Sequence, residues 1–447
     1  MKSLTACSGA LLLLGISVLG TGIRNKSQGD AAPAPLAVRR PAAPVGSHFY
    51  YPFIHKDKNV IIRRGDEPLE AFYGSLDSLA GGTRRKVNIV HIGDSHVQAD
   101  MFPGKLRESF HLDPALGNGG RGLTFPYRAV GTNSPINLKV AYTGTWTGCR
   151  NIARTQTCDW GLAGITATTN DPEATFTINP NLNAPLGLTY PVTRIKVFYD
   201  VHNASQFTVN LLNEGVTATQ HVDPRGFVEF QLETPVDEVR VGLQKSSPDQ
   251  LAFTLQGVTL ENDQPGVQYH SVGINGAEVG SFLRSPHLEA QLAVLEPDLV
   301  IVSLGTNDAF PASFDPAAFK RGYGTLIQRI RRAAPRASLL LTAPGDCYRG
   351  RRYPNLNNAK ATRQLLELAE ETGSAVWNFY EVMGGLRSIG KWYASGLAAS
   401  DKVHLTRKGY ELQGTLLYEA LLNDYYAYSG GQKVQVSEAL KKGEPGK

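Results

Sequence analysis

Ser95, His404 and Asp401 have the residue types from which a nucleophile, its base and an orienting acid can be built. Ser95 follows the apolar segment 87–92 within Gly-Asp-Ser-His. A serine hydroxyl is a poor nucleophile at neutral pH, so it needs a base within hydrogen-bond reach and a third group that holds the base. Asp401 precedes His404 by three residues, a spacing that puts both side chains on one face of a helical turn. These residues indicate acyl transfer through a serine, although an Asp-x-x-His motif alone is also typical of a surface turn.

Acyl transfer also needs hydrogen-bond donors for the oxyanion that develops in the transition state. Asn307 is a candidate because its side-chain amide follows the apolar segment 299–304. Gly276 is a second candidate, since glycine allows a backbone N–H to approach closely, but Gly273 lies only three residues away. The alternatives are a helix cap at Asn307 and an ordinary turn at Gly276. His96 is a poor base candidate because neighbouring residues in such a turn usually point apart.

Four further polar residues are candidates for supporting or binding roles. Asp94 is expected to hold the serine turn through backbone hydrogen bonds, and Asp308 to do the same for the asparagine that follows the second strand. Asp100 and Asn133 are expected to line the cleft and contact the substrate. No metal ion or other cofactor is expected, because no metal-ligand spacing connects the histidines near the motifs.

The segments around these residues alternate between strand and helix patterns. Such alternation predicts a parallel sheet covered by helices on both faces, an α/β fold. Ligands of such sheets bind beyond the carboxyl ends of the strands, where Ser95 and Asn307 both fall. The expected strands are 87–92, 299–304, 338–342 and 375–379, and the expected helices are 101–110, 280–295, 317–333, 358–372 and 408–425.

Between residues 138 and 262 the helical period gives way to short alternating strands punctuated by Gly, Pro, Asn and Asp. This pattern predicts an inserted β-sandwich, which leaves 48–137 and 263–428 as the catalytic domain. Cys149 and Cys158 can close a small disulfide loop in an oxidising compartment. The insert is expected to hold a polymer rather than to perform chemistry. Its aromatic residues can stack on sugar rings or pack the domain interface: Tyr142, Trp146 and Trp160.

The N-terminal segment predicts export. Residues 1–22 hold Lys2 and a short apolar run, which fits a secretory signal peptide or an uncleaved N-terminal anchor. Residues 23–47 are rich in Pro and Ala and read as a linker, and 429–447 as a disordered tail. We therefore expect a periplasmic or cell-envelope protein whose membrane contact is at most this anchor. The formal net charge is +5 and the basic residues are scattered, so no nucleic-acid partner is expected.

Four short sequence blocks, taken in order, resemble those of the SGNH (GDSL-like) hydrolase superfamily. They are Gly93-Asp94-Ser95, Gly276, Gly305-Thr306-Asn307-Asp308 and Asp401-x-x-His404. The resemblance implies a flavodoxin-like three-layer α/β fold. It also implies a nucleophile, a base and an acid at Ser95, His404 and Asp401, with an oxyanion hole formed by Gly276, Asn307 and the Ser95 N–H. His96 departs from the commonest version of the first block, which has Leu there.

A closer resemblance is to exported bacterial peptidoglycan O-acetylesterases, which carry a carbohydrate-binding-like β-sandwich between the first two blocks. The segments that carry it are 93–100, 119–122, 125–127 and 131–133. It implies an esterase that removes O-acetyl groups from a cell-envelope polysaccharide such as peptidoglycan, and therefore an O-acetylated glycan or other ester as partner. Three alternatives stay open: a lipase or thioesterase, a polysaccharide O-acetyltransferase, and a non-catalytic glycan-binding protein.

Overall fold

The computed structural model describes residues 51–64, 68–185 and 187–430. The predicted signal or anchor (1–22), the linker (23–47) and all but the first two residues of the tail (429–447) lie outside this part of the chain. Among the described residues, no helix combines the length and the hydropathy that a membrane crossing requires.

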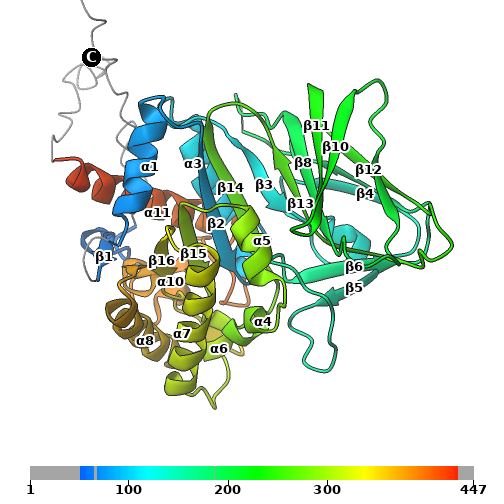
Figure 1. Cartoon of the computed structure of the whole chain (residues 1–447). Coiled ribbons are helices and arrows are strands. Elements are labelled where there is room, and N and C mark those ends of the chain that lie inside the picture. The colour runs from blue at the N-terminus through cyan, green and yellow to red at the C-terminus, as the bar shows by residue number, and fades with distance from the viewer. Residues whose placement is uncertain (1–50, 65–67, 186, 431–447) are drawn as a thin grey trace, which may run out of the picture. The chain divides into compact units, whose positions relative to one another are not determined.

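A six-stranded sheet forms the centre of the α/β part, in the order β1-β19-β16-β15-β2-β14 (Figure 1). Five neighbouring strands are parallel: β2 (Lys86–Gly93), β14 (Gly266–Gly273), β15 (Leu299–Ser303), β16 (Ser338–Thr342) and β19 (Ala375–Trp377). The edge strand β1 (Ile61–Arg63) pairs antiparallel with β19. The prediction of a parallel sheet therefore holds for the other five strands but not for this edge.

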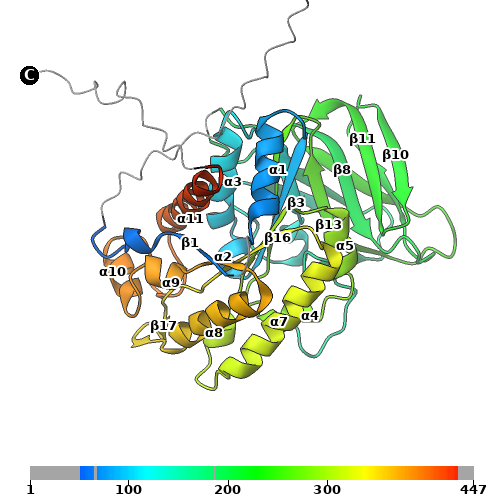
Figure 2. The same ribbon diagram turned by 60° about the vertical axis from the view of Figure 1, so that its left-hand side comes forward.

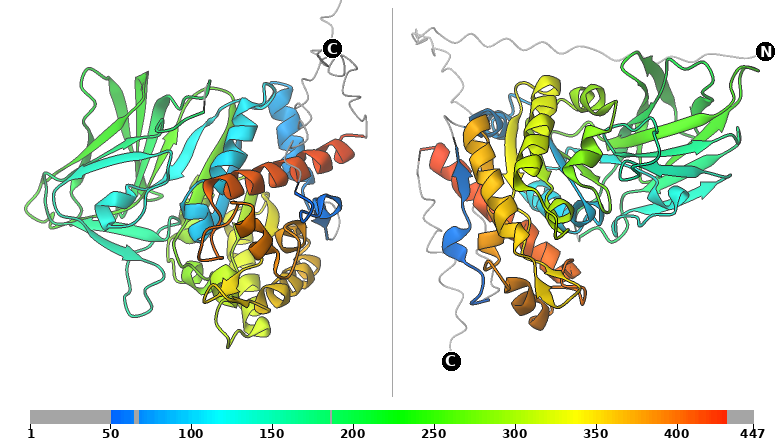
Figure 3. Two further views of the ribbon diagram at one scale, coloured as in Figure 1. Left: turned by 180° about the vertical axis from the view of Figure 1, so that it is seen from behind. Right: turned by 90° about the horizontal axis from the view of Figure 1, so that it is seen from below.

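Helices cover both faces of this sheet because its strands are apolar on both sides. Ile89 and Ile301 face one core with α1 (Glu70–Ala80), α3 (Phe102–Leu112) and α11 (Arg407–Tyr428). Val90 and Val302 face the other core with α4 (Val279–Leu283), α5 (Leu288–Val294), α7 (Pro316–Ala333) and α8 (Asn357–Thr372). In Figure 3, α11 runs beside α3 across the first face. The predicted three-layer architecture is confirmed.

The helix expected over 280–295 is two helices, α4 and α5. Pro286 lies between them. Proline lacks the N–H that a helix interior needs and disfavours helical backbone at the residue before it, so the helical period of the leucines continues across a break in the backbone.

Two antiparallel sheets form the strand-rich part. One has the order β4-β7-β12-β9, and the other β10-β11-β8-β13-β6-β5 with β3 also paired to β13. Their bounds are β3 (Gly120–Thr124), β4 (Lys139–Thr143), β5 (Thr147–Arg150), β6 (Ile165–Thr169), β7 (Thr175–Asn179), β8 (Val192–Tyr199), β9 (Thr208–Leu211), β10 (Ala218–Asp223), β11 (Phe227–Val236), β12 (Val239–Gln244) and β13 (Phe253–Glu261). The expected inserted β-sandwich is thus present, and β3, which precedes residue 138, joins its larger sheet.

The aromatic residues singled out in the insert differ in exposure. Trp160 is 2% exposed and donates its indole N–H to the carbonyl oxygen of Cys149 (3.1 Å). Trp146 packs between Phe176 and Phe253. Only Tyr142, 45% exposed, presents a large part of its side chain to solvent. Both tryptophans are therefore packed rather than presented to solvent, and Trp146 packs inside the insert rather than at the domain interface that we expected.

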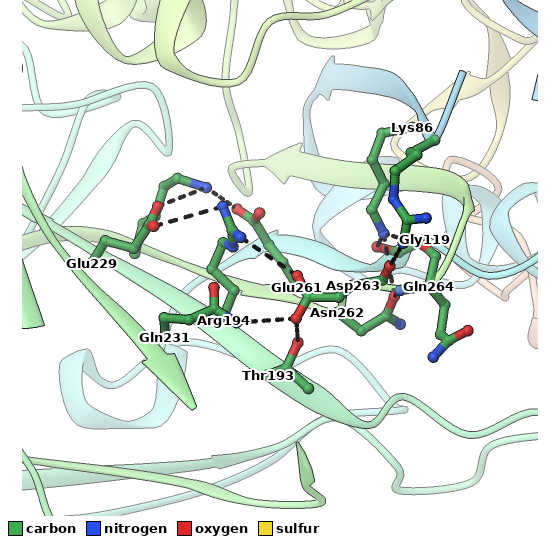
Figure 4. Close-up of polar contacts among 12 residues, drawn as sticks. Lys86, Gly119, Thr193, Arg194, Glu229, Gln231, Glu261, Asn262, Asp263 and Gln264 are labelled. Atoms are coloured by element: carbon green, nitrogen blue, oxygen red, sulfur yellow. Dashed lines mark hydrogen bonds and ion pairs between the residues drawn. The ribbon is translucent and has the colours of Figure 1, made fainter. Parts of the chain in front are cut away.

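Polar contacts join the insert to the start of β2 (Figure 4). The Lys86 ammonium donates to the side-chain oxygen of Asn262 (3.2 Å), at the end of the insert, and to the carbonyl oxygens of Gly119 (2.7 Å) and Gln264 (2.5 Å) on either side of it in the sequence. Nearby, Arg194 on β8 lies 3.4 Å from the carboxylate of Asp263, just after β13. The crossing from the insert back into the α/β sheet is therefore fixed by charged groups from both parts.

Candidate active site

Ser95 is the first residue of α2 (Ser95–Gln98), directly after β2. The turn from strand to helix needs Gly93, because a Cβ there would lie 2.3 Å from Cγ2 of Val97 and 2.9 Å from the carbonyl oxygen of Ser303. Asp94 caps the helix by accepting a hydrogen bond from the backbone N–H of His96 (3.0 Å). The expected role of Asp94 in holding the serine turn agrees with this contact.

A hydrogen-bonded chain joins Ser95, His404 and Asp401. The Ser95 hydroxyl and His404 Nε2 are 2.9 Å apart, and His404 Nδ1 and Asp401 Oδ2 are 2.8 Å apart. If Nδ1–H donates to Asp401, Nε2 is left as the acceptor for the serine proton. Partial burial acts to raise the pKa of the Asp401 carboxyl, but hydrogen bonds from the His404 ring and two backbone N–H groups hold that pKa below its usual value. Asp401 therefore stays ionised near neutral pH.

The loop that carries these two residues is tightly folded. Asp401 Oδ1 accepts from the backbone N–H groups of Val403 (2.9 Å) and His404 (3.0 Å). Lys402 adopts the left-handed region with φ of 54°, which lets the chain turn between the acid and the base. The Thr406 hydroxyl then caps α11 by accepting from the N–H of Gly409. The loop is therefore fixed at one end by the hydrogen bonds to the Asp401 carboxylate and at the other end by the start of α11.

His96 lies close to His404 but faces a different partner. Its Nδ1 and the Tyr410 hydroxyl are 2.8 Å apart, and the two imidazole rings are 5.2 Å apart. Burial and the neighbouring His404 lower the pKa of His96 to about 3, so this ring is neutral at physiological pH. His96 therefore packs beside His404 and is hydrogen-bonded to Tyr410 rather than to Ser95.

Asn307 and Gly276 lie in segments that touch each other. Asn307, in α6 (Thr306–Ala309), donates from Nδ2 to the carbonyl oxygen of Ala277 (3.0 Å), and its Nδ2 is 3.3 Å from Oδ2 of Asp94. No hydrogen bond between described residues uses the backbone N–H of Ser95 or of Gly276. Both N–H groups therefore have capacity for an oxyanion.

The sequence did not decide between Gly276 and Gly273 as the glycine of the oxyanion hole, and the structure requires glycine at these two positions for different reasons. Gly276 has φ of 82°, while a Cβ there would meet only Ile152, at 3.8 Å, so its turn requires the conformation rather than the close approach that we expected. At Gly273 a Cβ would lie 2.1 Å from the backbone nitrogen of Gln98. Gly273 therefore allows β14 to pack on α2.

Asp308 acts on a neighbouring segment rather than on the asparagine itself. Its carboxylate accepts from the N–H of Val279 at 3.1 and 3.3 Å, which anchors α4 just after the Gly276 turn. Burial, opposed by this hydrogen bond, raises the pKa of Asp308 to about 7. Burial likewise raises the pKa of Asp94 to about 7. The buried carboxyl of Asp94 and the partly buried carboxyl of Asp308 thus lie beside the candidate site.

The structure corrects the role expected for Asp100. Its side chain is 1% exposed, so it does not line the cleft. The carboxylate accepts from Arg107 (2.6 Å), Arg121 (2.7 Å) and Asn137 (2.8 Å), which ties the end of α2 to α3 and β3. Two guanidinium groups satisfy a buried charge here, and none of it is left for a substrate.

Asn133 is exposed, and its carbonyl oxygen accepts from Gln98 Nε2 (2.9 Å). The other end of Gln98 accepts from the N–H of Asn275 (2.7 Å). Gln98 therefore connects the loop of Asn133 to the Gly276 turn, a role that the sequence analysis missed. Its position three residues after Ser95, on one face of a helical turn, was the available signal.

The disulfide loop of the insert reaches the same turn. Cys149 and Cys158 are bonded, and between them Arg154 pairs with Glu278 (2.8 Å). Arg284, at the end of α4, donates to the carbonyl oxygen of Asn151. Among the described residues, no cluster of His, Cys, Asp and Glu has the arrangement of a metal site.

Residues 238–412 match the model of the GDSL-like Lipase/Acylhydrolase family. This range includes Gly276, Asn307, Asp401 and His404 and leaves out Ser95, which lies on the other side of the insert. No curated protein matches the sequence.

Solved structures give the comparison for the whole molecule. A peptidoglycan O-acetylesterase is 24% identical, with a TM-score of 0.67 over 82% of this chain and 99% of its own. A lipase/acylhydrolase from Enterococcus faecalis (21% identity, TM-score 0.30, 36% of this chain and 77% of its own) and an acetyl xylan esterase (17%, 0.29, 35% and 81%) are too distant to bear on the fold. The chain therefore has the fold of an SGNH hydrolase with an inserted β-sandwich, and the resemblance expected from its motifs is confirmed.

Proposed function

We propose that the chain is a serine ester hydrolase that removes O-acetyl groups from a cell-envelope polysaccharide such as peptidoglycan. The observation that carries the proposal is the chain of hydrogen bonds from Ser95 through His404 to Asp401, at 2.9 and 2.8 Å. Similarity to a peptidoglycan O-acetylesterase over most of the chain supports the substrate class. The disulfide supports an oxidising compartment, in line with the predicted export.

In the proposed mechanism, the Ser95 oxygen attacks the acetyl carbonyl while His404 Nε2 accepts the serine proton. Asp401 keeps the imidazole in the required tautomer and stabilises its positive charge. The N–H groups of Ser95 and Gly276 stabilise the oxyanion, and the Asn307 amide joins them by turning from its contacts with Ala277 and Asp94 toward that oxygen. His404 then gives its proton to the sugar oxygen, which leaves as an alcohol. Water, deprotonated by the same imidazole, hydrolyses the acetyl-serine and releases acetate.

We also propose that the insert, taken as 138–262, helps to hold the polymer. Its disulfide loop contacts the segment after Gly276, so polymer bound on the insert would lie beside the ester that reacts. Binding energy collected away from the reacting bond can be used to orient that bond. Tyr142 is the exposed aromatic side chain with which to test sugar stacking.

The test is acetate release from O-acetylated peptidoglycan, with an aryl acetate and a long-chain aryl ester as parallel substrates. We expect release of acetate from the glycan and the aryl acetate, little turnover of the long-chain ester, and none by Ser95→Ala. Preference for the long-chain ester would indicate a lipase instead. Appearance of the acetyl group on an added sugar acceptor rather than as free acetate would indicate a transferase. Full activity of Ser95→Ala would remove the serine from the mechanism.

A further inference from the structure

A short hairpin, β17 (Tyr348–Arg349) and β18 (Tyr353–Pro354), stands between the two segments that carry the proposed catalytic groups. On one side the backbone N–H of Tyr348 donates to the carbonyl oxygen of Lys402 (2.8 Å), two residues before His404. On the other side the side-chain amide of Asn355 donates to the carbonyl oxygen of Ala309 (3.0 Å), in the same helix as Asn307. The hairpin is therefore fixed to both edges of the candidate site.

Helix α10 (Ser388–Ala394) lies near the same hairpin (Figure 2), and Gly390 on it approaches Tyr348. A Cβ on Gly390 would lie 3.2 Å from the Tyr348 hydroxyl, so the helix backbone approaches the base of the hairpin closely. The Lys402 ammonium lies 5.2 Å from the centre of the Tyr348 ring and 5.4 Å from that of Tyr393 on α10. The hairpin, α10 and the loop of His404 thus share one surface around Tyr348.

The hairpin, α10 with its N-cap residue, and the loop of His404 carry six cationic side chains between them, and we call this set the basic face. None of them forms an ion pair with another described residue. Nearby carboxylates are already engaged: Asp401 with His404, and Asp346, 2% exposed, with the backbone N–H of Ile389. The six side chains therefore have no ion-pair partner among the described residues. The six residues are Arg349, Arg351, Arg352, Arg387, Lys391 and Lys402.

Exposed aromatic and apolar side chains lie among these cations. Tyr353 is 63% exposed, Leu356 56% and Tyr393 46%. Tyrosine rings pack on the apolar faces of sugar rings, and guanidinium groups bind carboxylates with two parallel hydrogen bonds. A neutral lipid ester would leave the six charges without partners. A sugar polymer with carboxylate groups matches both features of the surface.

We propose that the basic face binds the carboxylates of an acidic O-acetylated glycan while one of its acetyl esters lies at Ser95. The inference rests on the proposed function and adds the charge of the substrate to it. The carboxylates can belong to the sugars or to peptides attached to them, because the guanidinium groups recognise the same chemical group in both cases. Arg351 and Arg352 extend furthest along the hairpin from its two fixed ends and are both exposed.

The test is the charge-reversed variant Arg351→Glu with Arg352→Glu. Its matched control is Lys245→Glu with Arg336→Glu, which changes the net charge equally at two exposed cations outside the basic face and without ion pairs among the described residues. Values of kcat/KM are measured at low and high salt on an aryl acetate, on O-acetylated peptidoglycan and on a neutral O-acetylated xylan oligosaccharide. We expect about a tenfold loss for the hairpin variant on peptidoglycan at low salt, little change on the other two substrates, and little effect of the control.

A binding assay separates the inference from the proposed esterase activity. Ser95→Ala protein is sedimented with peptidoglycan and with peptidoglycan whose carboxylates have been amidated. We expect binding to the first, and loss of binding on amidation or in the presence of the hairpin substitutions. Equal binding to both polymers, or equal effects of hairpin and control substitutions, would overturn the inference even if acetate is released. Absence of acetate release together with carboxylate-dependent binding would overturn the proposed function instead.

Discussion

At the scale of single residues, the two carboxylate oxygens of Asp401 accept hydrogen bonds from different groups. One accepts from the His404 ring and the other from two backbone N–H groups. In Asp401→Asn the amide NH₂ can face Nδ1, which favours the tautomer that cannot take a proton from Ser95. We therefore expect kcat on an aryl acetate to fall by about 10⁴-fold, against about 10⁶-fold for His404→Ala. A larger loss in Asp401→Asn than in His404→Ala would contradict this order of roles.

A second prediction concerns the partly buried carboxyl of Asp308. Its pKa is raised to about 7, above that of an unfolded aspartate near 4, so the folded state holds a proton that the unfolded state has lost between these pH values. Its contribution to stability is therefore present at low pH and is lost as pH rises toward about 7. Asp308→Asn keeps an acceptor for the Val279 N–H without the charge.

The melting temperature of Asp308→Asn minus that of the wild type is expected to increase from pH 5 to pH 8. The comparison with the wild type is needed because other buried groups, such as His96, titrate in the opposite sense. A difference that does not change with pH would show that Asp308 is ionised in the folded protein throughout this range. Retention of activity on an aryl acetate by Asp308→Asn would place its role in stability alone.

The hydrogen-bonded arrangement of the proposed triad could be predicted from the sequence because each of its residues lies in a local motif with its partner or its turn. Asp100 could not, because its surroundings come from Arg107 on α3 and Arg121 on β3, which reach it only in the folded molecule. A polar residue beside a motif can serve substrate or structure, and its burial decides between them. Gln98 was missed for the same reason, since its two partners come from distant loops.

At the scale of elements, the disulfide loop is the part of the insert that contacts the candidate site. We expect Cys149→Ser with Cys158→Ser to lower the free energy of unfolding by about 2 kcal/mol, because the reduced loop gains freedom in the unfolded state. Activity on an aryl acetate is expected to fall several-fold, since Arg154 and Asn151 brace the segment after Gly276. Urea unfolding and kcat/KM measure the two effects.

Reducing agent supplies the control for this prediction. It should reproduce both effects in the wild type and leave the double variant unchanged, because Cys347 is the free cysteine of the described chain and is buried. If the double variant keeps full activity while losing stability, the loop supports the fold and not the turn.

The alternation of strands and helices was enough to predict the layers, because both patterns are local. The antiparallel edge strand β1 was not predictable, since its three residues pair with β19 more than 300 positions later. Likewise β3 lies before the predicted insert and yet pairs with β13 at its end. The residues of a strand give little information about which distant segment it pairs with.

At the scale of the whole molecule, the insert and the α/β part share one hydrophobic core. Val90 and Ile92 of β2 belong to the same buried cluster as Val258 and Leu260 of β13. His270 of β14 accepts a hydrogen bond from the backbone N–H of Leu123 in β3, at 3.0 Å. The two parts are therefore not independent, even though their strand patterns differ.

Removal of residues 138–262 with a short linker in their place is therefore expected to destabilise what remains. The deletion takes away β13, and with it the partner of β3 and one side of the shared core, so buried apolar surface would face water. We expect a broad or absent thermal transition, rapid proteolysis and loss of activity on an aryl acetate. A folded deletion variant that still cleaves the aryl acetate but has lost activity on the polysaccharide would contradict this, and would show that the insert only binds substrate.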